Sequence, residues 1–288
     1  MQTLEQLSPR IWYQTPVSDT DRPILCVVAG DNKSLMIDAG NSEAHASSFI
    51  SELHKRSLRQ PDIVALTHWH WDHIFGLSAL NMVSIASSHT KAAMAKLLRF
   101  EWTDEALDER VREGVEIEFC ANAIKQEFGA NREITVTLPD ITFEQRLEID
   151  LGGVSCILQH VGGDHAADSI VVYIKEEKVL FLGDCIYADI YNGPRKLTAE
   201  RTLKLLDALA EFDADTYILS HYKPVSRAEY ELEAAMLANI AKLSVRYCGD
   251  SERMKQAYEQ QLGRALNEEE LEVITYFVNG REGTPSES

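Results

Sequence analysis

The sequence HWHWDH at residues 68–73 contains three imidazoles and one carboxylate, all of them common metal ligands. It follows the apolar run IVAL at residues 63–66, which predicts a short buried strand. The ligand-rich stretch is therefore expected on the loop at a strand's end, where functional side chains are often held. Side chains this close in sequence diverge, so they do not all reach one tetrahedral ion. The pattern favours a site for two metal ions over a histidine cluster on a solvated loop.

Three later segments carry further candidate ligands, each beside a predicted strand. GGDH at residues 162–165 precedes the apolar run 170–174, VLFLGD at residues 179–184 ends in Asp184, and TYILSH at residues 216–221 ends in His221. One such residue after a strand is usually structural. All of these segments together, in this order along one chain, indicate a functional site.

The H-x-H-x-D-H spacing and the order of the later segments resemble the metallo-β-lactamase superfamily of metallohydrolases. One departure is that Gly163 and Asp164 stand where the family usually has Pro-Gly before the histidine of its third motif. The resemblance implies a four-layer αββα sandwich of the α/β class, with two sheets face to face and helices outside. Strands in such a fold are buried on both faces, which fits the near-continuous apolar runs of this sequence.

The resemblance also implies seven metal ligands. His68, His70 and His165 would hold one ion, Asp72, His73 and His221 would hold the other, and Asp184 would bridge them. The expected cofactors are two divalent metal ions. Zinc is the first expectation, and iron or manganese stay open because imidazole and carboxylate ligands suit all three.

His160 competes with His165 for the third motif, because it ends the predicted strand over residues 154–159. His165 lies four residues before Ser169, as the family's third-motif histidine does, so we favour His165. Among the remaining histidines, His45 and His54 fall in a polar, helix-like segment and are expected at the surface.

The resemblance implies hydrolysis by a hydroxide that bridges the two ions, on an ester, lactone or thioester. The alternatives are a phosphodiesterase, or an iron-dependent oxidoreductase on the same scaffold. We assign catalytic roles to Asp72, Asp184 and Tyr187. The Asp-x-x-Tyr spacing resembles the lactone-hydrolysing branch, in which the tyrosine contacts the substrate carbonyl, and a pocket-wall tyrosine is the alternative. Cys185 is expected to point away from the ions.

Composition narrows the class of partner. The chain has 28 basic and 46 acidic residues and a net charge of -18, a field that repels polyanions. We therefore expect a small-molecule substrate and no nucleic acid. No apolar stretch approaches the roughly 20 residues of a membrane span. With no signal-like N-terminus and five scattered, unpatterned cysteines, the sequence favours a cytoplasmic protein without membrane contact, and a homo-oligomer stays open.

We expect one domain over residues 1–288. Residues 89–131 read as a helical insertion, either a lid or an interface, with Phe100, Trp102, Phe119 and Phe128 as candidate substrate-facing side chains. The alternative is that these aromatic side chains pack the insertion onto the core or onto a second subunit. Residues 226–280 predict C-terminal helices that stop at Gly280, and residues 281–288 predict a frayed tail.

The same order of predicted elements occurs twice along the sequence. Residues 35–40 and 180–184 both read as apolar strands that reach an aspartate, Asp38 or Asp184. Each is followed by a helix-like segment and a short strand that leads to a histidine, His68 or His221. This pattern suggests two related β/α halves that meet at one site, with a structural role for Asp38.

Overall fold

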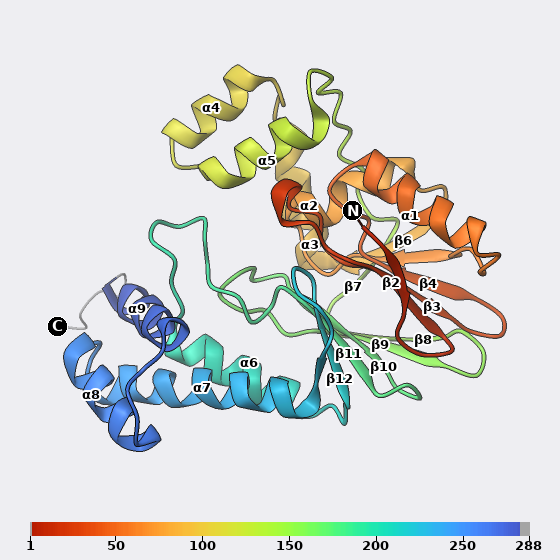
Figure 1. Ribbon diagram of the computed structural model, residues 1–288. Helices are drawn as coiled ribbons and strands as arrows, with labels where there is room; N and C mark the ends of the chain where they lie inside the picture. Colours follow the sequence, from red (N-terminus) through yellow and green to blue (C-terminus); the bar gives the residue numbers. More distant parts are fainter. Residues whose placement is uncertain (1, 283–288) are drawn as a thin grey trace.

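The computed structural model describes residues 2–282, and its strands form two sheets that face each other (Figure 1). The seven strands of the first sheet are neighbours in chain order: β1 (Leu4–Gln6), β2 (Ile11–Gln14), β3 (Leu25–Ala29), β4 (Ser34–Ile37), β5 (Ile63–Ala65), β6 (Val83–Ser87) and β7 (Ile141–Phe143). The second sheet consists of β8 (Arg146–Asp150), β9 (Ser155–His160), β10 (Ile170–Ile174), β11 (Val179–Gly183), β12 (Thr216–Leu219) and β13 (Val225–Ser226), also in sequential order.

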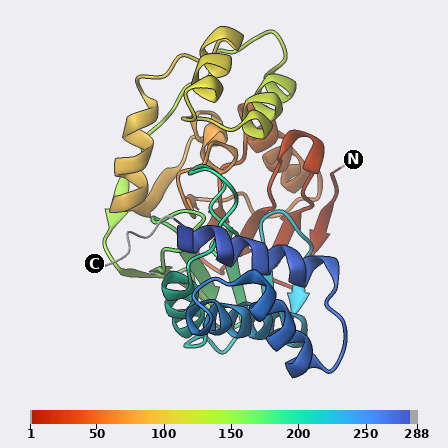
Figure 2. The same ribbon diagram turned by 90° about the vertical axis from the view of Figure 1, so that its left-hand side faces the viewer.

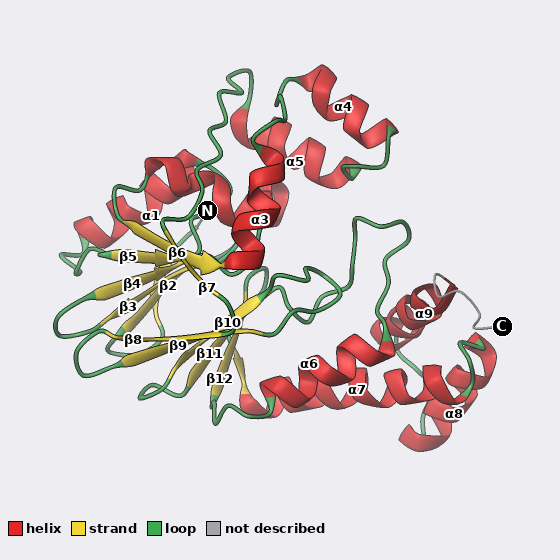
Figure 3. Cartoon of the chain, turned by 180° about the vertical axis from the view of Figure 1, so that it is seen from behind, coloured by secondary structure: helices red, strands yellow, loops and turns green. Residues whose placement is uncertain are grey.

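Helices cover the outer faces of both sheets, and Figure 3 shows this layering from behind. The helices are α1 (Glu43–Lys55), α2 (Trp71–Ile74), α3 (Ser88–Leu97), α4 (Asp104–Arg112), α5 (Glu118–Phe128), α6 (Ala199–Leu209), α7 (Arg227–Arg246), α8 (Ser251–Leu262) and α9 (Glu268–Glu282). Two 3-10 turns, at Ser18–Thr20 and Phe75–Ala79, complete the regular structure of the described residues. The predicted four-layer αββα sandwich is confirmed.

Strand β3 shows why these strands read as continuous apolar runs. Successive side chains of a strand point to opposite faces, so Cys26 and Val28 pack between the two sheets, while Leu25 and Val27 pack under the outer helices. Full burial of such a side chain stabilises the fold by roughly 1.5–3 kcal/mol. Edge strands differ. In β8 the residues alternate, with charged side chains outward, which protects an open edge from pairing with another chain.

Two parallel βαβ units correspond to the order of elements that occurs twice along the sequence. Strand β4 connects through α1 to its parallel neighbour β5, and β11 connects through α6 to its parallel neighbour β12. Parallel neighbours bring their carboxyl ends to the same edge of a sheet. The motifs at residues 68–73, 184 and 221 follow such ends, so the fold carries them toward one region.

Most of the predicted helical regions are present, with one corrected boundary. The insertion contains α4 and α5 together with most of α3. Helix α9 does not stop at Gly280 but continues to Glu282, so Arg281 is helical and does not belong to a frayed tail. The rest of the predicted tail, residues 283–288, lies outside the described residues. Within residues 2–282 no helix combines the length and apolarity that a membrane span requires.

Candidate metal centre

The HWHWDH stretch changes conformation halfway along. His68 and His70 lie on the loop after β5, whereas Asp72 and His73 lie in the short helix α2, which begins directly after His70. This change from loop to helix turns neighbouring side chains in different directions, and the two halves of the motif join two different groups of ligands.

The first group consists of His68, His70 and His165 and is buried. Nδ1 of His70 lies 3.0 Å from Nε2 of His68 and 2.9 Å from Nε2 of His165. His165 comes from the loop between β9 and β10, 95 residues from His70. The fold therefore converges three ring nitrogens from two separate segments on one point.

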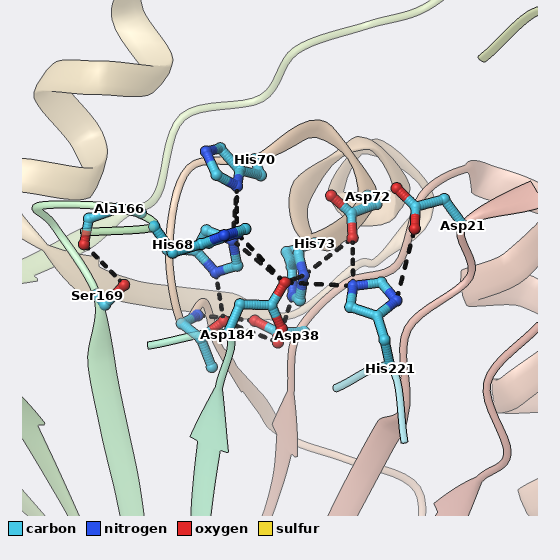
Figure 4. Close-up of polar contacts among 12 residues, drawn as sticks. Asp21, Asp38, His68, His70, Asp72, His73, Ala166, Ser169, Asp184 and His221 are labelled. Carbon is cyan, nitrogen blue, oxygen red and sulfur yellow. Dashed lines mark hydrogen bonds and ion pairs between the residues drawn. The ribbon is translucent and has the colours of Figure 1, made fainter. Parts of the chain in front are cut away.

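The second group consists of Asp72, His73, Asp184 and His221. Oδ2 of Asp72 lies 3.0 Å from Nε2 of His73 and 3.2 Å from Nε2 of His221. Figure 4 shows these side chains pointing toward one another from α2 and from the ends of β11 and β12. All the groups that the motif analysis singled out as metal ligands are thus present in one of two adjacent clusters.

Asp184 faces both groups. Its Oδ2 lies 3.4 Å from Nε2 of His165 in the first group. The same atom lies 3.2 Å from Nε2 of His221 in the second group (Figure 4). Gly183, just before it, has a φ of 58°, in the left-handed region, and a Cβ there would lie 3.1 Å from the Cβ of Thr67. A glycine at this position lets β11 pack closely on the loop that carries His68 and turns Asp184 toward the centre.

The donor set fits divalent metal ions. Ligand atoms about 2.0–2.1 Å from a tetrahedral zinc ion lie roughly 3.3 Å from one another, and the spacings above are close to this. In the described part of the chain Oδ1 of Asp184 is buried without a hydrogen-bond partner, and the close contact between Oδ2 of Asp72 and Nε2 of His73 does not have the geometry of a hydrogen bond. Each unpaired buried polar atom costs about 1–3 kcal/mol, and bound cations would satisfy such atoms.

The opposite ring nitrogens of three histidines are held in place. Nδ1 of His68 lies 3.1 Å from Oγ1 of Thr67, Nδ1 of His73 lies 2.8 Å from Oδ2 of Asp38, and Nδ1 of His165 lies 3.1 Å from the Ala188 carbonyl oxygen. A proton on Nδ1 that is donated to these oxygens leaves the lone pair of Nε2 directed at the cluster. This is the arrangement that protein histidines adopt around metals.

Electrostatics differ between the two groups. Burial holds the pKa of His68, His70 and His165 below the ordinary imidazole value, so their lone pairs are available to a metal. Burial also opposes a charge on His73 and His221, but the nearby carboxylates outweigh it and raise the pKa of both rings. The second group thus favours positive charge, which a metal cation would provide.

Two aspartates support the rings from outside the clusters. Asp38 is fully buried, and besides its contact with His73 it accepts hydrogen bonds from the backbone N–H and the hydroxyl of Thr67. The structural role predicted for it corresponds to this network. Oδ1 of Asp21 lies 3.6 Å from Nδ1 of His221 (Figure 4). Asp21 belongs to no motif, and sequence reasoning missed it because it follows a 3-10 turn far from the other site segments.

The structure separates His165 from the competing His160. The ring of His160 stacks on His89 at a centroid distance of 4.8 Å and contacts the Ala167 carbonyl oxygen, away from both clusters. Cys185 packs in the apolar core beneath α6, and its thiol has a pKa raised by burial. His54 is exposed as expected, but the surface placement of His45 is wrong, since it is fully buried at the first turns of α1.

A pocket of about 350 Å³ opens over both groups. Apart from the candidate ligands, most of its wall comes from Ile117 and the first turn of α5 and from the loop 184–198 after β11. Asp21 and, from α9, Tyr276 complete the lining. Figure 2 shows this loop between the insertion and α9. The volume lies at the lower end of the roughly 300–1,000 Å³ of small-molecule sites.

Of the four aromatic residues predicted to face substrate, Phe119 lines the pocket. Phe100, Trp102 and Phe128 do not, so that part of the prediction is wrong. They pack inside the first helical layer, where the ring centroid of Phe75 lies 4.8 Å from that of Trp102 and 6.3 Å from that of Phe128. Helical spacing alone does not distinguish a pocket wall from the packing of an insertion.

Tyr187 lies in the pocket, with its ring centroid 6.1 Å from that of His165 and 6.4 Å from that of His221. Tyr191, which sequence reasoning missed, lies over His70 at 4.9 Å, and its hydroxyl contacts Sγ of Cys120 at 3.5 Å. The turn-forming sequence DIYNGP at residues 189–194 was the available signal, because it indicates an ordered loop directly after the fourth motif.

The family model described as the metallo-beta-lactamase superfamily matches residues 19–221, a span that contains every candidate ligand. Three relatives resemble the chain in sequence. A linear primary-alkylsulfatase of Pseudomonas sp. is 25% identical over 68% of this chain and 40% of its own length. A metallo-beta-lactamase fold-containing protein of Sulfurisphaera tokodaii is 29% identical over 62% of both. An acyl-coenzyme A thioesterase of Homo sapiens is 23% identical over 61% of this chain and 63% of its own length. Each match spans less than two thirds of the relative.

Solved structures share the fold. A double mutant of the sec-alkylsulfatase PisA1 superposes with a TM-score of 0.68 at 18% identity, over 98% of this chain and 50% of that one. A metallo-beta-lactamase from Pontibacter korlensis gives a TM-score of 0.58 at 17% identity, over 82% of this chain and 98% of that one. Identities this low establish the fold alone.

Proposed function

This chain belongs to the metallo-beta-lactamase superfamily, and we propose that it is a hydrolase that cleaves a small ester, thioester or lactone with two divalent metal ions. The observation that carries the proposal is the convergence of seven ligand side chains beneath one pocket, with the carboxylate of Asp184 between the two groups.

In this proposal each residue has a separate task. His68, His70 and His165 hold one ion, Asp72, His73 and His221 hold the second, and Asp184 contacts both. Zinc is our first choice, and the same donors also suit iron or manganese. When bound, the ions would supply a water-derived nucleophile near neutral pH and polarise the scissile carbonyl. The hydroxyl of Tyr187 would donate a hydrogen bond to the oxyanion that develops there.

The pocket favours an acyl compound over a phosphodiester. Ile117, Phe119 and Ile190 form an apolar wall on which an acyl or alkyl chain can lie. The net charge of -18 on the chain also disfavours a polyanionic phosphodiester such as nucleic acid. The names of two relatives describe enzymes that act on an alkyl sulfate and an acyl thioester, and both substrates join an apolar chain to a polar group.

A substrate panel tests the function. We would assay the zinc-, iron- and manganese-loaded protein with 4-nitrophenyl butyrate, butyryl-coenzyme A, a γ-lactone, decyl sulfate and bis(4-nitrophenyl) phosphate. The expected result is that kcat/KM is highest for an ester, thioester or lactone and is lost in Asp184→Ala. A preference for the phosphodiester or the alkyl sulfate would contradict the proposed substrate class. Oxygen consumption without hydrolysis would show that the protein is instead an iron-dependent oxidoreductase.

We further propose that the protein is cytoplasmic, consists of one domain, acts on a small molecule and does not bind nucleic acid. The five cysteines are all unpaired, which fits a reducing compartment. The acidic net charge argues against a nucleic-acid partner.

A further inference from the structure

Arg195 is the one lysine or arginine among the described residues that line the pocket. Its side chain is exposed, and its guanidinium interacts with the side chain of Tyr276, a second lining residue whose hydroxyl donates a hydrogen bond to Glu272. It takes part in no ion pair with a carboxylate of residues 2–281, whereas the nearby Lys196 lies 3.6 Å from Asp189 and Arg201 lies 3.8 Å from Asp164. These two cations pair directly with carboxylates, whereas Arg195, among the residues that the structure describes, reaches a carboxylate, that of Glu272, only through the Tyr276 hydroxyl.

The backbone around Arg195 is fixed by α9. The side-chain amide of Asn279 donates to the Arg195 carbonyl oxygen at 2.9 Å, and the N–H of Leu197 donates to the Tyr276 carbonyl oxygen at 3.0 Å. A Cβ on Gly280 would lie 2.1 Å from the Leu197 carbonyl oxygen, so α9 packs directly on this segment. Figure 2 shows α9 beneath the loop. A cation held by its backbone in this way loses less freedom when it binds a ligand.

We propose that Arg195, positioned by Tyr276, binds a carboxylate at the end of the substrate that lies away from the scissile bond. This inference rests on the proposed function and narrows its substrate class. The substrate would be an ester, thioester or lactone whose apolar chain lies along Ile117 and Phe119 and carries a terminal carboxylate.

The charge balance favours a carboxylate over a phosphate at this subsite. A guanidinium offers parallel N–H donors that match a carboxylate. The Tyr276 hydroxyl donates its proton to Glu272, so it can hold the guanidinium in place but does not donate to the ligand. One guanidinium balances one negative charge, whereas a phosphate monoester carries about -1.5 to -2 at pH 7. Arg195 is the one cationic side chain among the described residues of the lining, so the second charge of a phosphate would find no second cationic side chain there.

The test compares two esters that differ in one group: mono-4-nitrophenyl adipate, with a terminal carboxylate, and 4-nitrophenyl hexanoate, of the same chain length without it. For Arg195→Met we expect the ratio of kcat/KM, adipate over hexanoate, to fall about tenfold, with kcat/KM for the hexanoate within about twofold of wild type. Arg195→Lys should give an intermediate ratio, because lysine keeps the positive charge but lacks the paired N–H donors of the guanidinium.

Arg146→Met is the matched control. Arg146 is exposed on β8, outside the pocket lining, and its replacement removes the same charge from the chain. Arg146→Met should leave the adipate-to-hexanoate ratio of kcat/KM unchanged. An equal fall of this ratio in Arg146→Met and Arg195→Met would show a general effect of the protein's charge and overturn the subsite. A ratio that changes less than about twofold in Arg195→Met, or an equal loss for both esters, would also overturn it.

A binding measurement tests the carboxylate subsite independently of the proposed hydrolase activity. The probes are 6-amino-6-oxohexanoate and hexanamide, two amides that differ in the same terminal carboxylate, titrated by calorimetry into the metal-loaded protein. We expect the carboxylate probe to bind more tightly to wild type and to lose that advantage in Arg195→Met, whether or not any ester is hydrolysed. Equal binding of the two probes to wild type, or no binding of either, would overturn the subsite even if ester hydrolysis is observed.

Discussion

Oδ2 of Asp38 lies 2.8 Å from Nδ1 of His73, and both side chains are fully buried. Asp38 has a φ of 61°, a left-handed conformation that aspartate and asparagine tolerate better than most residues. This turn at the end of β4 directs the carboxylate at the ring and at the loop residue Thr67. The first βαβ unit thus contributes an orienting group where the second contributes the ligand Asp184.

Asp38→Asn tests this orienting role, because asparagine keeps the shape and the backbone preference and removes the charge. We expect the affinity for the more weakly bound metal ion to fall about 10- to 100-fold, since a carboxylate behind a ligating imidazole raises its basicity. Competition with a chromophoric chelator measures the affinity, and circular dichroism checks the fold. An unchanged affinity would show that Asp38 only braces the turn.

Removal of Asp184 should abolish the metal pair. Wild-type protein is expected to hold close to two ions per chain, and Asp184→Ala to hold fewer, because one carboxylate oxygen faces both groups. Elemental analysis measures the content, with far-ultraviolet circular dichroism as the control for folding. One tightly held iron in the wild type, with oxygen consumption, would contradict the two-ion hydrolase.

The two competing histidines give a matched pair of variants. His165→Ala should lose one metal equivalent and most activity, because it removes one of the three imidazoles of the first group. His160→Ala should keep both, since that ring stacks on His89 outside the clusters. Metal content and kcat measured side by side distinguish the two variants, and the reverse result would mean that the third motif is assigned to the wrong residue.

Tyr187→Phe tests the oxyanion donor. The phenyl ring retains the packing between His165 and His221, so the change isolates the hydroxyl. We expect kcat to fall by about ten- to a thousandfold at constant metal content, as happens when a transition-state donor is lost. A change below about twofold on the best substrate of the panel would leave Tyr187 as a pocket wall.

Chelation should lower thermal stability. The proposed ligands come from both sheets, and ions that bind the folded state alone stabilise it by mass action. We expect Tm to drop on the order of 10 °C after dialysis against a chelator and to recover on addition of zinc. Differential scanning calorimetry measures it, with Asp184→Ala as the control, whose Tm should respond much less. An equal response of the variant would indicate metal binding elsewhere.

The sequence by itself determined the fold and the candidate ligands. The HWHWDH motif and the three strand-end motifs after it are local patterns, and the strands that carry them are apolar on both faces, so their place in a four-layer sandwich could be predicted. Both βαβ units could also be predicted from the sequence, because the strands and the helix of each unit, and the histidine after it, are consecutive along the chain.

Tertiary structure decided what surrounds the ligands. Asp21, Tyr191, Arg195 and Tyr276 reach the pocket from a 3-10 turn, a loop and α9, and no local pattern connects segments so far apart. The same reason explains the errors on Phe100, Trp102, Phe128 and His45: periodicity indicates that a side chain faces something, but packing decides whether that is substrate, core or solvent. Metal ligands must follow a strict spacing, whereas a pocket wall needs only to fill space, and many sequences can do that.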